Sequence, residues 1–107
     1  MLISGVDGGF DFGTPEVLDW ELDAIWNAID QQTIVFSRHA GHEMNLDVLV
    51  LDDVLDAISF PDETSKDLPG GTRAPGINFD RVLGHVRIRV KVGYREAYYV
   101  IITVMAN

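Results

Sequence analysis

The sequence predicts one α+β domain, with N-terminal helices packed on one face of a twisted, mainly antiparallel sheet. Three observations support this fold class. Apolar residues recur at helical spacing in the first half of the chain, up to Pro61. Apolar and polar residues alternate through much of the second half, which is typical of strands. The chain has 107 residues and is 47% hydrophobic, which suits a single folded core.

The chain begins with a glycine-rich segment that precedes the first helical pattern. Residues 1–13 are expected to form a flexible arm, so the single domain is expected to cover residues 14–107. Thr14 offers a capping hydroxyl and Pro15 fits the first turn of a helix. Apolar residues then follow the helical period, and the first helix is predicted to run from about residue 15 to residue 31.

Two shorter helices are predicted before Pro61. Residues 33–36 are apolar enough for a short strand, and Ser37 is the expected cap of a helix that ends near residue 45. A third helix is predicted over residues 50–59, because its apolar residues follow the helical period. Pro61 is expected to end this helix, since proline cannot continue one.

The second half of the chain is predicted to form most of the sheet. A loop is expected at residues 68–76, where prolines and glycines are concentrated. Gly84 marks either a turn between two strands or a bulge within one bent strand. Another turn is expected at residues 93–96. The predicted strands cover residues 62–65, 78–83, 85–92 and 97–105.

One predicted strand has a basic residue at every second position, with an apolar residue between, so its basic residues should share one face of the sheet. The residues of this basic stripe are His85, Arg87, Arg89 and Lys91. The chain as a whole is acidic, with 8 Lys and Arg, 17 Asp and Glu, and a net charge of −9. The basic stripe is therefore interpreted either as a site for an anion or as cations that pair with nearby carboxylates such as Asp80 or Glu96.

Composition narrows the classes of function. High acidity disfavours nucleic-acid binding at ordinary salt, because phosphate contacts dominate that affinity. Acidity with only two lysines also suits concentrated salt, so a halophilic source and an acidic surface kept for solubility both stay open. The absence of cysteine excludes disulfides and thiolate chemistry. No segment has the pattern of a membrane span or a signal peptide, so a cytoplasmic protein without a membrane partner is expected.

Several residues in the middle of the chain follow a family pattern. Phe-Ser-Arg-His-Ala covers residues 36–40, Met44 follows, and Asp-Asp-Val covers residues 52–54, with no gap in the spacing. Near the C-terminus, Val-Ile-Ile-Thr-Val covers residues 100–104. These segments resemble the DUF4258 family, whose pattern is a strand ending in Ser-x-His-Ala, a helix with Arg-Met, a Glu-Asp-Val-x-x-Ala-Leu segment and a similar last strand.

The DUF4258 family is similar to the RelE and BrnT toxins, which are small ribonucleases of toxin–antitoxin pairs. The resemblance implies a RelE-like fold, RNA cleavage without a metal or other cofactor, and an antitoxin protein as partner. It also implies functional roles for His39 and for the basic residues of the late strands. The chain departs from the family at Glu43 and Asp47, where the family has arginine, and at Val50, which replaces a capping serine.

The candidate site follows from what metal-free RNA cleavage requires. Proton transfer needs an acid and a base, which suits histidine, and the phosphate needs cationic donors, which suits arginine. The candidate catalytic residues are His39, His85, Arg87 and Arg89, and the candidate RNA-binding residues are Arg38, Arg81, Lys91 and Tyr99. The alternatives are local hydrogen bonding for His39, a surface cation for Arg38, and packing within the sheet for the strand tyrosines.

Two functions follow from these residues. The first is a RelE/BrnT-like toxin domain that acts as a metal-independent endoribonuclease, with RNA and an antitoxin as partners. The second is a non-catalytic protein-binding module on the same scaffold, which binds a protein through its apolar final strand and the basic stripe. A homodimer through an exposed sheet edge is compatible with both functions. A metal site with two ligands from the segment His39-x-x-His42-Glu43 and His85 as the third is not expected, because its order and spacing match no zinc signature.

Overall fold

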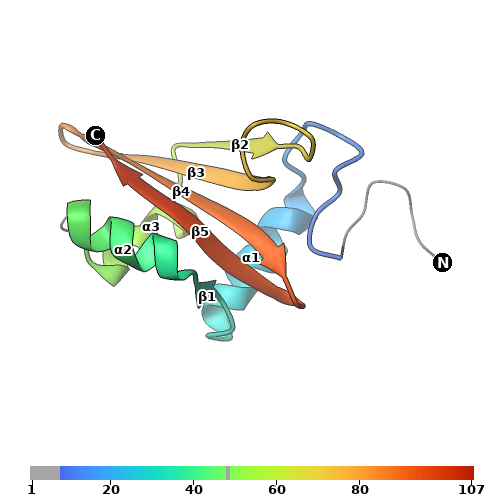
Figure 1. Ribbon diagram of the computed structural model, residues 1–107, viewed down its shortest axis with the longest axis horizontal. Helices are drawn as coiled ribbons and strands as arrows, with labels where there is room; N and C mark the ends of the chain where they lie inside the picture. Colours follow the sequence, from blue (N-terminus) through green and yellow to red (C-terminus); the bar gives the residue numbers. More distant parts are fainter. Residues whose placement is uncertain (1–7, 48) are drawn as a thin grey trace.

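The computed structural model describes residues 8–47 and 49–107. Three helices and five strands form one layer of helices and one sheet (Figure 1). In chain order the elements are α1 (Asp19–Asp30), β1 (Val35–Phe36), α2 (Arg38–Asp47), α3 (Leu51–Ser59), β2 (Glu63–Asp67), β3 (Gly76–Leu83), β4 (Val86–Arg95) and β5 (Tyr98–Ala106). Within the two described ranges, no helix combines the length and the apolar character that a membrane crossing needs.

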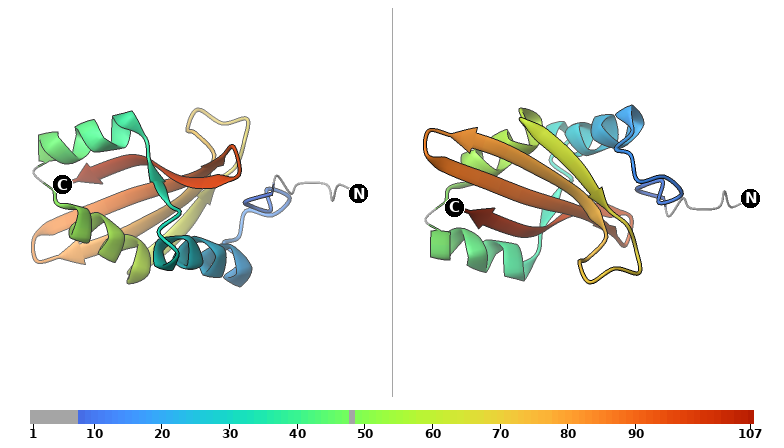
Figure 2. Two further views of the ribbon diagram at one scale, coloured as in Figure 1. Left: turned by 90° about the horizontal axis from the view of Figure 1, so that it is seen from below. Right: turned by 90° about the horizontal axis from the view of Figure 1, so that it is seen from above.

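The strands form a single sheet in the order β1-β5-β4-β3-β2. Strand β1 pairs with β5 in parallel, and every other neighbouring pair is antiparallel. The two views of Figure 2 show the helices on one side of this twisted sheet, with the opposite side uncovered. We call the uncovered side the open face. The predicted α+β fold, with helices on one face of a mainly antiparallel sheet, is confirmed.

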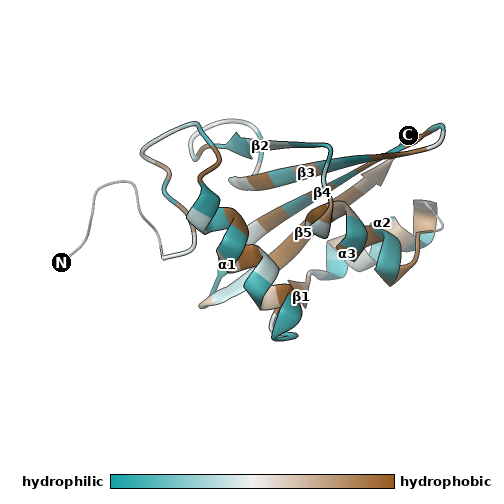
Figure 3. Cartoon of the chain, turned by 180° about the vertical axis from the view of Figure 1, so that it is seen from behind, coloured by the Kyte–Doolittle hydropathy of each residue, from teal (hydrophilic) through white to brown (hydrophobic). Residues whose placement is uncertain are grey.

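The core lies between the helices and the covered face of the sheet. Alternation along β4 sends Ile88, Val90 and Val92 into this core, where each is almost fully buried. The residues between them in β4 take the open face. Figure 3 shows the same alternation of hydrophilic and hydrophobic residues along β3 and β4. The helices add apolar side chains from the other side of the core, including Ile25, Val54 and Ile58.

The start of α2 agrees with the prediction from the sequence, and the start of α1 differs from it. Ser37 caps α2 as predicted, because its Oγ accepts a hydrogen bond of 3.0 Å from the backbone N–H of Ala40. Helix α1 begins at Asp19, so the predicted start near Pro15 is wrong. The reason is Glu21, whose Oε1 accepts a hydrogen bond of 2.7 Å from the N–H of Leu18 and so fixes the first turn.

The late strands agree with one of the two predicted alternatives at the first of their turns and differ from the prediction at the second. Gly84 has a φ of 61° and lies in the turn between β3 and β4, so these are two strands and not one bent strand. The irregularity in the ladder lies between Lys91 and Val92 instead. The second turn consists of Glu96 and Ala97, both with positive φ, which extends β4 into the predicted turn at residues 93–96.

Part of the predicted arm packs against the domain. Residues 1–7 lie outside the described part of the chain. Residues 8–13 form no helix, but Phe10 is 1% exposed and its ring lies 5.6 Å from the ring of Tyr99. The Tyr99 hydroxyl donates a hydrogen bond of 2.8 Å to the carbonyl of Gly9. Residues 9 and 10 are therefore anchored to β5, and Phe10 belongs to the hydrophobic core.

A buried ion pair links β2 to α1. Lys66 Nζ lies 2.8 Å from Glu21 Oε1, and both side chains are completely buried. Lys66 Nζ also donates to the carbonyl of Asp11, while the N–H of Asp11 donates to Glu21 Oε2. These bonds satisfy both charges and hold the start of α1, the anchored segment and the edge strand together.

We predict that Lys66→Met lowers the free energy of unfolding by about 3 to 5 kcal/mol, because it leaves the Glu21 carboxylate buried without its cation. The double variant Glu21→Gln/Lys66→Met should recover part of this loss, since no uncompensated charge stays in the core. Urea unfolding of both variants measures the effect. Arg95→Met removes an exposed cation and serves as the control. A loss for Lys66→Met no larger than that of the control would contradict the role of the pair.

Candidate functional site

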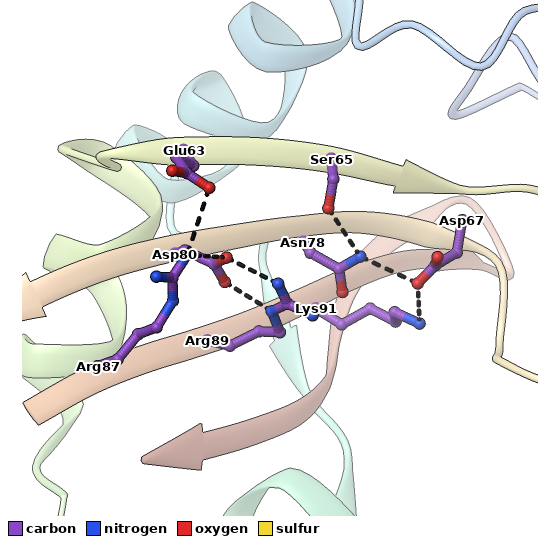
Figure 4. A network of polar contacts seen from close by, with 8 residues as sticks. All are labelled: Glu63, Ser65, Asp67, Asn78, Asp80, Arg87, Arg89 and Lys91. Atoms are coloured by element: carbon purple, nitrogen blue, oxygen red, sulfur yellow. Dashed lines mark hydrogen bonds and ion pairs between the residues drawn. The ribbon is translucent and has the colours of Figure 1, made fainter. Parts of the chain in front are cut away.

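The open face carries a row of paired charges across three neighbouring strands. The register places Asp80 of β3 opposite Arg89 of β4 and opposite Glu63 of β2. We call this set the ion-pair row, and Figure 4 shows its side chains. Its members are Glu63, Ser65 and Asp67 on β2, Asn78 and Asp80 on β3, and Arg87, Arg89 and Lys91 on β4.

Asp80 is the centre of one half of the ion-pair row. Its carboxylate accepts hydrogen bonds of 2.7 and 2.8 Å from Nε and Nη2 of Arg89, and one of 3.0 Å from Nη2 of Arg87. Two guanidinium groups thus share one carboxylate that is almost fully buried. The hydrogen bonds from Arg89 outweigh the effect of burial and hold the pKa of Asp80 below its usual value of 3.8. Nη2 of Arg87 also lies 3.3 Å from Oε2 of Glu63.

Lys91 is the centre of the other half. Its Nζ lies 2.7 Å from Asp67 Oδ2 and donates a second bond of 2.7 Å to the carbonyl of Ala74. Asn78 donates to the same carboxylate oxygen at 2.9 Å and to Ser65 Oγ at 3.3 Å. Burial raises the pKa of Asp67, but the hydrogen bonds from Asn78 and Lys91, together with the positive charges of Lys91 and Arg73, lower it below its usual value.

The basic stripe is therefore neutralised within the sheet. Three of its cations, Arg87, Arg89 and Lys91, each lie in an ion pair with a carboxylate of β2 or β3. This is one of the two interpretations that the sequence left open, and Asp80 is the partner that it named. Glu96 lies in the β4–β5 turn and forms none of these pairs.

The two candidate histidines lie beside different parts of β5, far from each other. His39 is in the first turn of α2, which starts where Ser37 Oγ donates to the carbonyl of Ile102. His85 is in the β3–β4 turn, beyond the level at which Arg87 and Asn107 exchange backbone hydrogen bonds. About five residues of strand, or roughly 16 Å, separate these two levels. His39 Nε2 lies 3.4 Å from Glu43 Oε1, which is the local contact that the sequence offered as its alternative role.

The predicted RNA-binding residues do not form a common surface with the ion-pair row. Arg38 is exposed at the start of α2. Arg81 donates a hydrogen bond of 3.0 Å to the carbonyl of Phe60, and its guanidinium lies 5.8 Å from the centre of the Phe60 ring. The ring of Tyr99 packs against Phe10, and its hydroxyl donates a hydrogen bond to the carbonyl of Gly9. Only Lys91 of the predicted set belongs to the ion-pair row.

A hollow of about 390 Å³ lies beside the ion-pair row on the open face. Its cations are Arg73, Arg89 and Lys91. Arg73 is not among the predicted site residues, although it is the one basic residue in the predicted loop at residues 68–76. None of the described residues that line the hollow is a histidine. The other residues that line it are Glu43, Asp67, Ala74, Asn78, Thr103 and Met105. Across the described chain, no cluster of three or more His, Asp or Glu is arranged to hold a metal ion.

Glu43 closes the edge of the sheet next to β5. Strand β1 has only two residues and covers β5 at Val100 and Ile101. Beyond it, Ser37 Oγ donates to the carbonyl of Ile102, and Glu43 Oε1 accepts a hydrogen bond of 2.8 Å from the buried N–H of Val104. From the sequence, Glu43 stands out as a departure from the family pattern and as part of a metal site that is not expected, and not as a structural acceptor. Its position shows that it satisfies an edge strand that has no further strand as neighbour.

We predict that Asp80→Asn lowers the free energy of unfolding near pH 7 by about 2 kcal/mol, because the charged hydrogen bonds to both arginines are lost. The pKa of Asp80 is lowered by folding, so its stabilising effect is complete above 3.8 and is lost as the pH falls through the lowered pKa. Urea unfolding at a series of acid pH values should therefore show that the free energy of unfolding falls less with decreasing pH in the variant than in the wild type. Asp23→Asn, at an exposed carboxyl of α1, is the control. Parallel pH curves for all three proteins would refute this role of Asp80.

We predict that Glu43→Ala lowers the free energy of unfolding by about 1 to 3 kcal/mol, because it leaves the buried N–H of Val104 without an acceptor. Glu43→Gln keeps a side-chain oxygen at this position, so its free energy of unfolding should fall much less. Amide hydrogen exchange at Val104 gives a local measurement, and it should accelerate in the alanine variant alone. If both variants behave alike, the carboxylate acts through its charge and not through this hydrogen bond.

Comparisons of this chain with protein-family models, with curated proteins and with solved structures returned no match. The resemblance to the DUF4258 family and the RelE-like character of the fold therefore stay predictions from the sequence.

Proposed function

We propose that this chain is a non-catalytic protein-binding module on an α+β scaffold. The observation that carries this proposal is the neutral ion-pair row, in which Arg87, Arg89 and Lys91 all hold carboxylates of the same sheet. An RNA phosphate that used these cations would have to replace Asp80 on two arginines and leave that carboxylate buried without a partner. This exchange opposes binding, and the chain's net charge of −9 opposes it further.

The arrangement of proton-carrying groups supports the same proposal. Metal-free RNA cleavage needs an acid and a base within reach of one phosphate and its cationic donors. His39 and His85 lie at different levels of β5, and His39 is 65% exposed at its side chain. In a binding module the ion-pair row needs no such groups, because its task is to stabilise the uncovered face of the sheet.

The module differs from the sequence-based version in the surface that it offers. The final strand is not free to bind a partner along its edge, because β1, Ser37 and Glu43 already pair with it between Val100 and Val104. The partner surface therefore lies elsewhere on the domain. We place the module in the cytoplasm, with a protein as its partner.

The hollow beside Arg73 favours a second candidate, the RelE/BrnT-like endoribonuclease of a toxin–antitoxin pair. Arg73, Arg89 and Lys91 border a space large enough for a phosphate group. Arg73 is exposed and is the one of the three without a direct ion pair among the described residues. In this candidate RNA is the substrate and an antitoxin is the partner. Formation of a homodimer is compatible with both candidates.

We predict that the purified chain cleaves no RNA, either in dilute buffer or in molar salt, because the cations of the ion-pair row are neutralised by carboxylates of the same sheet. The experiment incubates the wild type and the variants Arg87→Ala/Arg89→Ala and Arg73→Ala with total RNA and follows RNA integrity. Growth of a host that expresses each protein is followed in parallel.

The variants separate the two candidates. RNA cleavage by the wild type that disappears in either variant would overturn the binding module in favour of the endoribonuclease. Affinity purification from the native host tests the module directly, and recovery of the chain alone as a monomer would count against it.

A further inference from the structure

The net charge of the protein is concentrated in its helical layer. Residues 14–60, which contain α1, α2 and α3, have ten acidic residues and one basic residue, Arg38, which is a net charge of −9. Residues 61–107, which contain β2 to β5, have five acidic and seven basic residues, which is a net charge of +2. Because the helices lie on one side of the sheet (Figure 2), the molecule has one strongly acidic side.

This acidic side contains an apolar hollow of about 320 Å³ between α1, β1 and α3. It is lined by five apolar residues and one glutamine, and the side chain of Leu51 is half exposed at its border. The neighbouring residues Val35 and Val50 are 42% and 60% exposed. Apolar surface of this kind is unfavourable in water and favours contact with an apolar partner group. The lining residues are Ile29, Gln32, Ile34, Phe36, Leu51 and Leu55.

Exposed carboxylates accompany the lining residues along the two helices. Asp30 follows Ile29 at the end of α1, and Asp52 follows Leu51 at the start of α3; both aspartates are exposed. Neither forms an ion pair within the described chain. The hollow therefore has an apolar lining, and next to it in the chain are Asp30 and Asp52, which we call the acidic surround.

We propose that this hollow binds a basic amphipathic helix of a partner protein, which rests on the proposed function as a binding module. The apolar face of such a helix supplies side chains at i, i+3, i+4 and i+7 to fill the hollow. Its lysines and arginines then meet the unpaired carboxylates of the surround. The occupant fits the charge of the site in a way that other occupants do not. Nucleic acid, an anionic lipid surface and a second copy of this acidic layer would each bring like charge to it.

The test uses two synthetic peptides and fluorescence anisotropy with the full chain. The first peptide is a labelled helix with leucines along one face and lysines elsewhere. The second has the same composition in an order that spreads the leucines around the helix. The wild type should bind the first peptide at least about tenfold more tightly than the second, because only the first presents a continuous apolar face. Leu51→Gln, at a half-exposed position, should reduce this binding by about fivefold or more while the circular dichroism spectrum stays unchanged.

Charge variants test the acidic surround. Asp30→Asn/Asp52→Asn should weaken binding of the first peptide and reduce its dependence on salt. Glu16→Gln/Glu96→Gln changes the net charge equally at exposed residues that do not line the hollow, and it should have a smaller effect. Wild-type binding of neither peptide, equal binding of both, or unchanged binding by Leu51→Gln would each overturn the inference. RNA cleavage by the wild type would overturn the proposed function instead, so the two failures are distinguishable.

Discussion

The sheet of this protein is covered by helices on one face only, and the rest of the structure depends on this constraint. Every strand in the middle of the sheet must bury one row of side chains and present the next row to the uncovered side. The apolar row of β4 enters the core, so its basic row has to occupy the open face. Carboxylates from β2 and β3 meet those cations there, and the open face becomes a neutral, hydrogen-bonded surface.

The same pairing of charges explains how an acidic protein keeps a cluster of cations. Asp80 and Asp67 are the carboxylates that the sheet uses internally, and folding lowers the pKa of both. The excess of negative charge is left on the helical layer, where few cations are available to pair with it. A surface of one sign selects a partner of the opposite sign, whereas a neutral surface selects by shape. This division leaves the helical layer, and not the basic stripe, as the strongly charged surface of the molecule.

Two carboxylates from the helices, each in a buried contact, hold the two edges of the sheet. Glu21 pairs with Lys66 and ties the start of α1 to the edge strand β2. Glu43 bonds the N–H of Val104 and closes the other edge, where β1 is too short to cover β5. Both edges of the sheet thus depend on a helical glutamate. Glu43 stands where the predicted family resemblance would place an arginine, and here it supplies the acceptor that the edge strand needs.

The sequence by itself determined the fold class, the approximate elements and the alternation of β4, because these follow from local periods of apolar residues and from caps such as Ser37. It also indicated that cations of the basic stripe share one face. Tertiary structure alone decided which carboxylates neutralise Arg87 and Arg89, how far apart His39 and His85 lie, and where α1 begins. The physical reason is that each of these features depends on the register between strands or on a partner distant in the chain, and no local pattern encodes either.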